Sequence, residues 1–128
     1  MMQLRTSYRV RRALVIILAL ATVVWASLPA QGQQEITFTA VEKEGSKVWE
    51  GGGTIDLKGP VTLKVKNTLT ADHGFAIDTM KVKEVIKPGE EKTITVPLAD
   101  IDKAVSEHRV YCQLHPKHVA ATIKVTGK

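Results

Sequence analysis

The residues best suited to chemistry are the single cysteine and three of the four histidines. Cys112, His115 and His118 lie within seven residues, in the run YCQLHPKH at 111–118, and His73 lies upstream at the start of the run HGFAI. A thiolate with two imidazoles makes a trigonal site that suits copper, and a weaker fourth ligand completes it. A structural zinc site usually has more sulfur than one cysteine supplies. The spacing therefore predicts a copper site.

Taken alone, the cysteine and each histidine could have an ordinary structural role instead of binding a metal. A buried cysteine usually packs as a small apolar side chain, and most single histidines are surface or core residues. Here the thiol has no partner for a disulfide, and a free thiolate in an oxidising compartment is open to damage. A metal that holds the sulfur of Cys112 explains why it is there. His108 has no such context, and we expect it to be exposed to solvent.

The elements around these residues follow a period of two, which is typical of β-strands. Seven short strands are predicted, at 36–41, 61–66, 75–77, 82–86, 93–96, 109–112 and 122–125. Only residues 98–106 look helical, and residues 42–53 are expected to be a loop or an irregular strand. Short strands separated by turn residues indicate an all-β sandwich. The cysteine and two histidines then lie between the last two strands, where a loop can turn their side chains toward one point.

The first thirty residues form a separate segment. Residues 13–30 carry no charge, and Arg11 and Arg12 stand directly before them. A basic start, an apolar stretch and small residues after it describe a signal peptide. The 18 apolar positions also reach the short end of what a membrane anchor needs. We expect residues 1–30 to be a signal peptide or an anchor, and residues 31–128 to be a periplasmic or otherwise extracytoplasmic domain, held at the inner membrane if the segment is retained.

Charge and composition exclude some partners. The formal net charge is +5, but four of the basic residues lie in the first twelve positions, and from Gln31 onward 14 basic residues face 13 acidic ones. Aromatic residues make up only 5% of the chain. Nucleic-acid binding needs a basic face on the folded domain, and base stacking needs aromatic residues. We expect no nucleic-acid partner and no membrane contact other than through residues 13–30.

The chain resembles the cupredoxins, which are small copper proteins, and among them the nitrosocyanin-like group. The resemblance rests on GFAID at 74–78, VKEVIKPGEEKTITV at 82–96 and CQLHPK at 112–117. It implies a cupredoxin-like Greek-key β-sandwich in which Cys112 and His115 match the family's loop ligands. His118 matches the second histidine of that group approximately, and His73 stands where that group has a glutamate.

The departures from the family pattern bear on the number of copper ions and on the fourth ligand. A binuclear copper site needs a second cysteine on the loop, which is absent, so one copper ion is predicted. The blue copper type usually has a methionine after the loop histidine, and none follows His115. Met80 is the alternative fourth ligand, but we expect it to pack in the core. His118 then completes a site of three histidines and one cysteine. An imidazole is a stronger donor than a thioether, which predicts a lower reduction potential and a green or red colour.

Three functions remain in view for such a site. An electron carrier rather than an enzyme is favoured, working with a redox partner protein that the sequence does not identify. A nitrosocyanin-like site with an open position could instead bind or convert a small molecule such as nitric oxide. A copper delivery protein is the third possibility, although such proteins tend to be rich in surface methionine or histidine.

Overall fold

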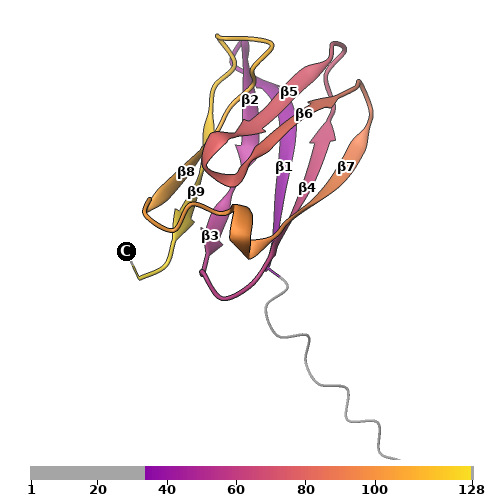
Figure 1. The fold of residues 1–128 in the computed structure, drawn as a ribbon. Helices are drawn as coiled ribbons and strands as arrows, with labels where there is room; N and C mark the ends of the chain where they lie inside the picture. The colour runs from indigo at the N-terminus through magenta and orange to yellow at the C-terminus, as the bar shows by residue number, and fades with distance from the viewer. Residues whose placement is uncertain (1–33, 128) are drawn as a thin grey trace, which may run out of the picture.

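A computed structural model describes residues 34–127, which form nine strands and two short 3₁₀ helices (Figure 1). In chain order they are β1 (Gln34–Lys43), β2 (Ser46–Gly51), β3 (Gly53–Ile55), β4 (Val61–Asn67), β5 (His73–Ile77), η1 (Asp78–Met80), β6 (Val82–Ile86), β7 (Glu91–Val96), η2 (Leu98–Asp100), β8 (Glu107–Val110) and β9 (Ala121–Val125). The predicted signal or anchor segment lies outside the described residues. Within residues 34–127, no helix has both the length and the apolar character that crossing a bilayer requires.

The strands form two layers. One layer is the sheet β2-β1-β4-β7, in which β1 and β4 run parallel. The other contains β3-β9-β8 and the hairpin β5-β6. Within this second layer, two backbone hydrogen bonds of 2.9 and 3.0 Å, between Ala76 on β5 and Tyr111 after β8, join the hairpin to the three-stranded sheet. The predicted all-β sandwich is confirmed.

The core lies between the two layers and follows the predicted alternation. On β1 and β4 every second side chain faces inward and is at most 5% exposed: Ile36, Phe38, Ala40, Val61, Leu63 and Val65. Phe75 on β5 completes the contact from the opposite layer, with its ring 5.3 Å from that of Phe38 and 5.2 Å from that of Trp49. Trp49 is 3% exposed and comes from β2. These three rings connect the layers at the end of the sandwich where His73 lies.

The prediction of a loop or irregular strand at 42–53 was wrong in its main part. Residues 34–43 and 46–51 form a regular antiparallel hairpin, and β3 begins at Gly53. The intervening glycines carry the chain from one layer to the other. Gly51 and Gly52 have φ of +125° and +122°, and a Cβ atom on either would collide with a carbonyl oxygen, of Thr37 or Thr122 respectively. Only glycine allows this crossing.

The predicted helix at 98–106 is also mostly wrong. Only Leu98–Asp100 forms a single 3₁₀ turn. Ile101 is extended, with φ −88° and ψ 122°, and its side chain is 3% exposed. The backbone N–H of Asp102 donates to the carbonyl of Thr79, at 2.8 Å, rather than to a carbonyl of its own segment. Burial of Ile101 and this tertiary hydrogen bond replace the helix.

His108 is the third correction, because it is fully buried rather than exposed to solvent. It lies on β8 with its ring facing the core, and its Nδ1 atom is 2.6 Å from Oγ1 of Thr79. Burial lowers the pKa of His108, with a smaller opposing effect from Asp102. The ring is therefore a neutral core group that depends on the Thr79 hydroxyl for its hydrogen bond.

Thr79→Val should destabilise the protein by about 1–3 kcal/mol, because it leaves a buried nitrogen of His108 without its partner. Urea unfolding followed by circular dichroism measures this. Thr93→Val is the matched control: Thr93 is exposed on β7, so its change should stay within about 0.5 kcal/mol. Equal unfolding free energies for the two variants would contradict the role given to Thr79.

Candidate metal centre

The cysteine and histidines of the site come from two places in the chain. His73 is the first residue of β5, and Cys112, His115 and His118 lie on the loop of residues 111–120 between β8 and β9 (Figure 1). β5 and the start of this loop are neighbours through the backbone hydrogen bonds of Ala76 with Tyr111. Strand pairing therefore brings His73 next to Cys112, which lies 39 residues away in sequence.

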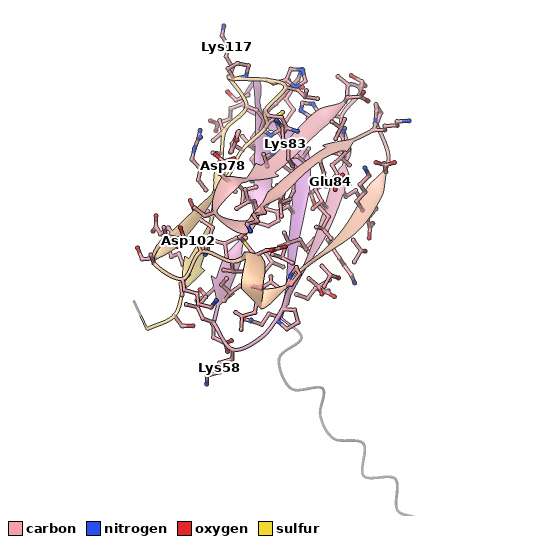
Figure 2. All side chains as sticks on the ribbon, viewed as in Figure 1. Lys58, Asp78, Lys83, Glu84, Asp102 and Lys117 are labelled. Atoms are coloured by element: carbon pink, nitrogen blue, oxygen red, sulfur yellow. The ribbon has the colours of Figure 1, made fainter. Side chains whose placement is uncertain are left out.

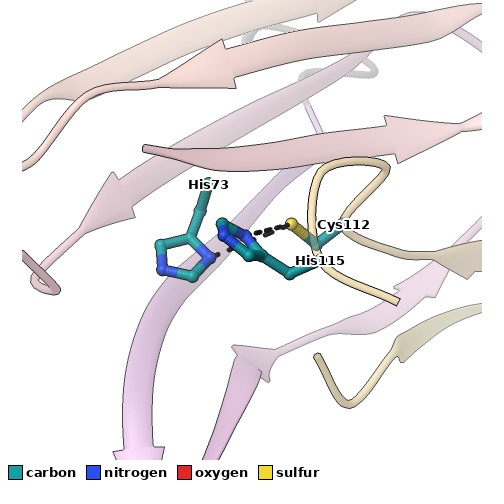
Figure 3. A group of neighbouring side chains, drawn as sticks. All are labelled: His73, Cys112 and His115. Atoms are coloured by element: carbon teal, nitrogen blue, oxygen red, sulfur yellow. Dashed lines mark hydrogen bonds between the residues drawn. The ribbon is translucent and has the colours of Figure 1, made fainter. Parts of the chain in front are cut away.

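The donor atoms lie at separations that suit one metal ion. Figure 3 shows the imidazoles of His73 and His115 beside the sulfur of Cys112, which is 3.8 Å from Nδ1 of His73 and 3.5 Å from Nδ1 of His115. One ligand atom from each of these three residues can be chosen so that all three lie within 4.8 Å of one another. A metal bound at about 2.0–2.3 Å from each donor needs donors roughly 3.3–3.7 Å apart. The geometry thus fits the trigonal thiolate and imidazole set.

The ring of His118 lies beside that of His73. Its Nδ1 atom is 3.1 Å from Nδ1 of His73, and both side chains are buried. Its ring stacks on Trp49, with centroids 5.3 Å apart and planes 16° from parallel. The following residue is fixed to β2, because the N–H of Val119 donates to the carbonyl of Lys47 at 2.8 Å. Packing and backbone pairing together hold the ring of His118 beside that of His73.

Met80 does not share this position. It ends η1, which follows the far end of β5 from His73, and it is 1% exposed within the hydrophobic core. The sequence left either His118 or Met80 as the fourth donor. The structure brings the ring of His118 to His73 and leaves Met80 in the core.

Gly74 supports the sulfur directly. Its backbone N–H donates to Sγ of Cys112 at 3.1 Å, and its carbonyl accepts from the indole N–H of Trp49 at 3.1 Å. A hydrogen bond to the sulfur stabilises the thiolate and tunes the potential of a bound metal. The close approach requires glycine, because a Cβ atom would collide with the side chain of Gln113 and would lie 2.9 Å from its backbone nitrogen.

Asn67 holds the turn that leads into His73. Its side-chain N–H groups donate to the carbonyls of Ala71 and Ile86, at 2.8 and 2.9 Å, and its oxygen accepts from the N–H of Leu69. The residue is fully buried at the end of β4. These bonds order the short connection between β4 and β5, so His73 begins its strand in a fixed orientation.

The imidazoles of His73 and His118 are held in the neutral form that metal binding needs. The pKa of His73 is lowered from its ordinary 6.5 to about 4, first by burial, then by the charges of His118, His115 and Lys47, while Asp72 raises it. Burial also lowers the pKa of His118, against a backbone interaction with Val48 that raises it. At pH 7 each of these rings therefore has one unprotonated nitrogen whose lone pair can bind a metal.

Sequence reasoning missed the residues that position the donors. Trp49 and Asn67 were not identified, although Trp49 is the sole tryptophan beyond residue 30. Such a large apolar residue inside a segment expected to be a loop was a usable signal. Phe75 lies in the core, whereas Tyr111 is half-buried and donates its hydroxyl to Asp78 at 2.7 Å.

Comparisons with known proteins give a likeness of structure rather than of sequence. No protein-family model matches the chain, and no curated protein sequence matches it. Among solved structures, the McoA multicopper oxidase of the hyperthermophile Aquifex aeolicus is similar over 77% of this chain, with a TM-score of 0.60 and 12% identity. Copper nitrite reductase from Nitrosomonas europaea is similar over 73%, with a TM-score of 0.56 and 19% identity. The chain spans 30% and 41% of their respective lengths.

These likenesses, together with the two-layer topology, define the fold. The chain has a cupredoxin-like Greek-key β-sandwich, as the sequence predicted. The candidate metal centre lies at one end of it, between the start of β5 and the loop that precedes β9.

Gly74→Ala should lower stability by about 1–3 kcal/mol, because the added methyl group meets both the side chain and the backbone of Gln113. Thermal unfolding measures the change. Combining it with Gln113→Ala should recover only part of the loss, since the backbone contact remains. If the double variant were as stable as the unsubstituted protein, the added methyl group would collide only with the side chain of Gln113 and not with its backbone.

The metal-free protein should lose stability as the pH falls below 6.5. The unfolded chain then takes up a proton at position 73 that the folded protein refuses until about pH 4, so the unfolded state is favoured. His73 alone accounts for about 2 kcal/mol between pH 7 and pH 5. Urea unfolding across this range measures it, and His73→Gln should flatten the slope. An unfolding free energy of the unsubstituted protein that does not change between pH 7 and pH 5 would contradict the lowered pKa of His73.

Proposed function

We propose that this chain is an exported, mononuclear copper protein that transfers electrons, with copper held by His73, Cys112, His115 and His118. The observation that carries the proposal is the convergence of one buried thiol and three imidazoles from two distant segments, with neighbouring donors 3.1–3.8 Å apart. One thiolate with imidazoles is the donor set of copper electron-transfer sites. The likeness to a multicopper oxidase and a copper nitrite reductase supports copper over other metals.

Electron transfer is favoured because the donors are already in place. Copper bound there would exchange one electron between its two common oxidation states. His73 is fixed by β5 and the turn before it, Cys112 by the N–H of Gly74, and His118 by Trp49. A rigid donor set changes little when the charge at its centre changes, which keeps the barrier to transfer low. His115 is half-buried, unlike the other three, and offers the path from the centre to the surface.

An open site is the second candidate, and it differs from the first in whether His118 binds the metal. The set whose ligand atoms, one from each residue, lie within 4.8 Å of one another contains His73, Cys112 and His115 but not His118. If His118 stays unbound, a fourth position is available for a small molecule, as in the nitrosocyanin-like alternative. If it binds, the site is closed and suits an electron carrier that works with a redox partner protein.

Copper loading should give one ion per chain and a visible absorption band from the thiolate. Cys112→Ser should abolish the band and weaken copper binding by at least about 100-fold, since it removes a ligand rather than a supporting contact. His118→Ala should change the band and the copper EPR spectrum. Metal analysis, optical spectra and EPR measure these effects.

Met80→Leu is the matched control, because it conserves volume in the core and should leave the copper spectra unchanged. A spectrum that changes in Met80→Leu and not in His118→Ala would reverse the assignment of the fourth ligand. A reversible one-electron wave in voltammetry would support a carrier. Rapid loss of Cu(I) to a competing chelator, without such a wave, would indicate copper delivery instead.

A further inference from the structure

A pocket of about 310 Å³ opens beside the metal centre. It is lined by Gly45, Ser46, Lys47, His115, Lys117 and His118. The two histidines are candidate ligands, so the pocket lies directly against the centre on the side of the half-buried His115. Its other walls are the tip of the β1–β2 hairpin and the loop between β8 and β9. The proposed electron transfer gives a role to His115 but none to the two lysines of this pocket.

The pocket is built from firmly held backbone. The hairpin turns through Glu44 and Gly45, which have φ of +50° and +78°. Positive values at both central residues are those of the tight two-residue turns that match the twist of paired strands. The loop is fixed to β2 by two hydrogen bonds, from the N–H of Val119 to the carbonyl of Lys47 and from the N–H of Trp49 to the carbonyl of Val119. Lys47 and His118 are therefore kept on adjacent walls.

The charge of the lining has one sign. Lys47 and Lys117 contribute two ammonium groups, and none of the six lining residues is acidic. Among residues 34–127, neither lysine takes part in an ion pair. A concave site with uncompensated positive charge concentrates anions.

We infer that this pocket binds a small inorganic anion, held by Lys47 and Lys117 against the imidazole of His115. A volume of about 310 Å³ admits an anion of a few atoms with its remaining water molecules. The site needs no metal, because the lysines supply the charge. Copper at the adjacent centre would add to the attraction, and to that extent the inference rests on the proposed function.

Metal-free protein tests the pocket by itself. We would titrate the ¹⁵N-labelled chain with nitrite, and separately with azide, in a low-chloride buffer. Backbone amide shifts should be confined to residues 45–47, 115, 117 and 118 and should saturate. Lys47→Gln and Lys117→Gln should each weaken binding by about fivefold, the effect of one unit charge at about 4 Å in water. Added salt should weaken it further.

Lys58→Gln is the matched control, because Lys58 and Lys117 lie at opposite ends of the sandwich (Figure 2). It removes the same charge and should leave anion binding unchanged. Equal affinity in Lys58→Gln and in the double variant of Lys47 and Lys117 would overturn the inference, as would shifts that fail to saturate or that spread over the whole surface.

A copper-loaded arm separates this inference from the proposed function. Azide should alter the copper EPR spectrum of the unsubstituted protein, and more weakly that of the double lysine variant. Failure of copper to bind would count against the proposed function only, because the metal-free titration still tests the pocket. Normal copper binding with no lysine-dependent effect of either anion would count against the pocket only.

Discussion

The pairing of β5 with the segment after β8 is the constraint on which the centre depends. Two backbone hydrogen bonds between Ala76 and Tyr111 join the hairpin β5-β6 to the three-stranded sheet. They set the register that places Gly74 against Cys112, so that a backbone N–H meets the sulfur at 3.1 Å. His73, one residue earlier, is then directed at the same point. A slip of one residue would turn its side chain to the opposite face of the strand.

Much of the fold could be predicted from the sequence, because alternation of apolar residues is a local signal. All seven predicted strands are present, and the clustering of Cys112, His115 and His118 already indicated where the centre lies. Strands β2 and β3 were missed because glycines and charged residues hide their alternation. They are strands because β1 and β9 pair with them, and such pairing is not visible in a short stretch of sequence.

The remaining errors share a physical cause, which is that the deciding partner lies far away in the chain. His108 has polar neighbours in sequence, but Thr79, 29 residues away, supplies the hydrogen bond that allows its burial. Trp49 supports His118 only because the loop of residues 111–120 returns to β2. The types of the donor residues are therefore readable in the sequence, whereas the residues that orient them are revealed only by the tertiary structure.

The parallel pairing of β3 with β9 has a consequence for how the thiol is protected while the protein folds. Thr126 bonds to the carbonyl of Ile55 across 71 residues, and the loop that carries Cys112 lies just before this last strand. Contacts so distant in sequence form late, because closing a long loop costs entropy before any contact repays it. The thiol, which is only 4% exposed in the folded protein, lies on the loop that this strand closes, so we expect it to be buried late and to be open to oxidation until then.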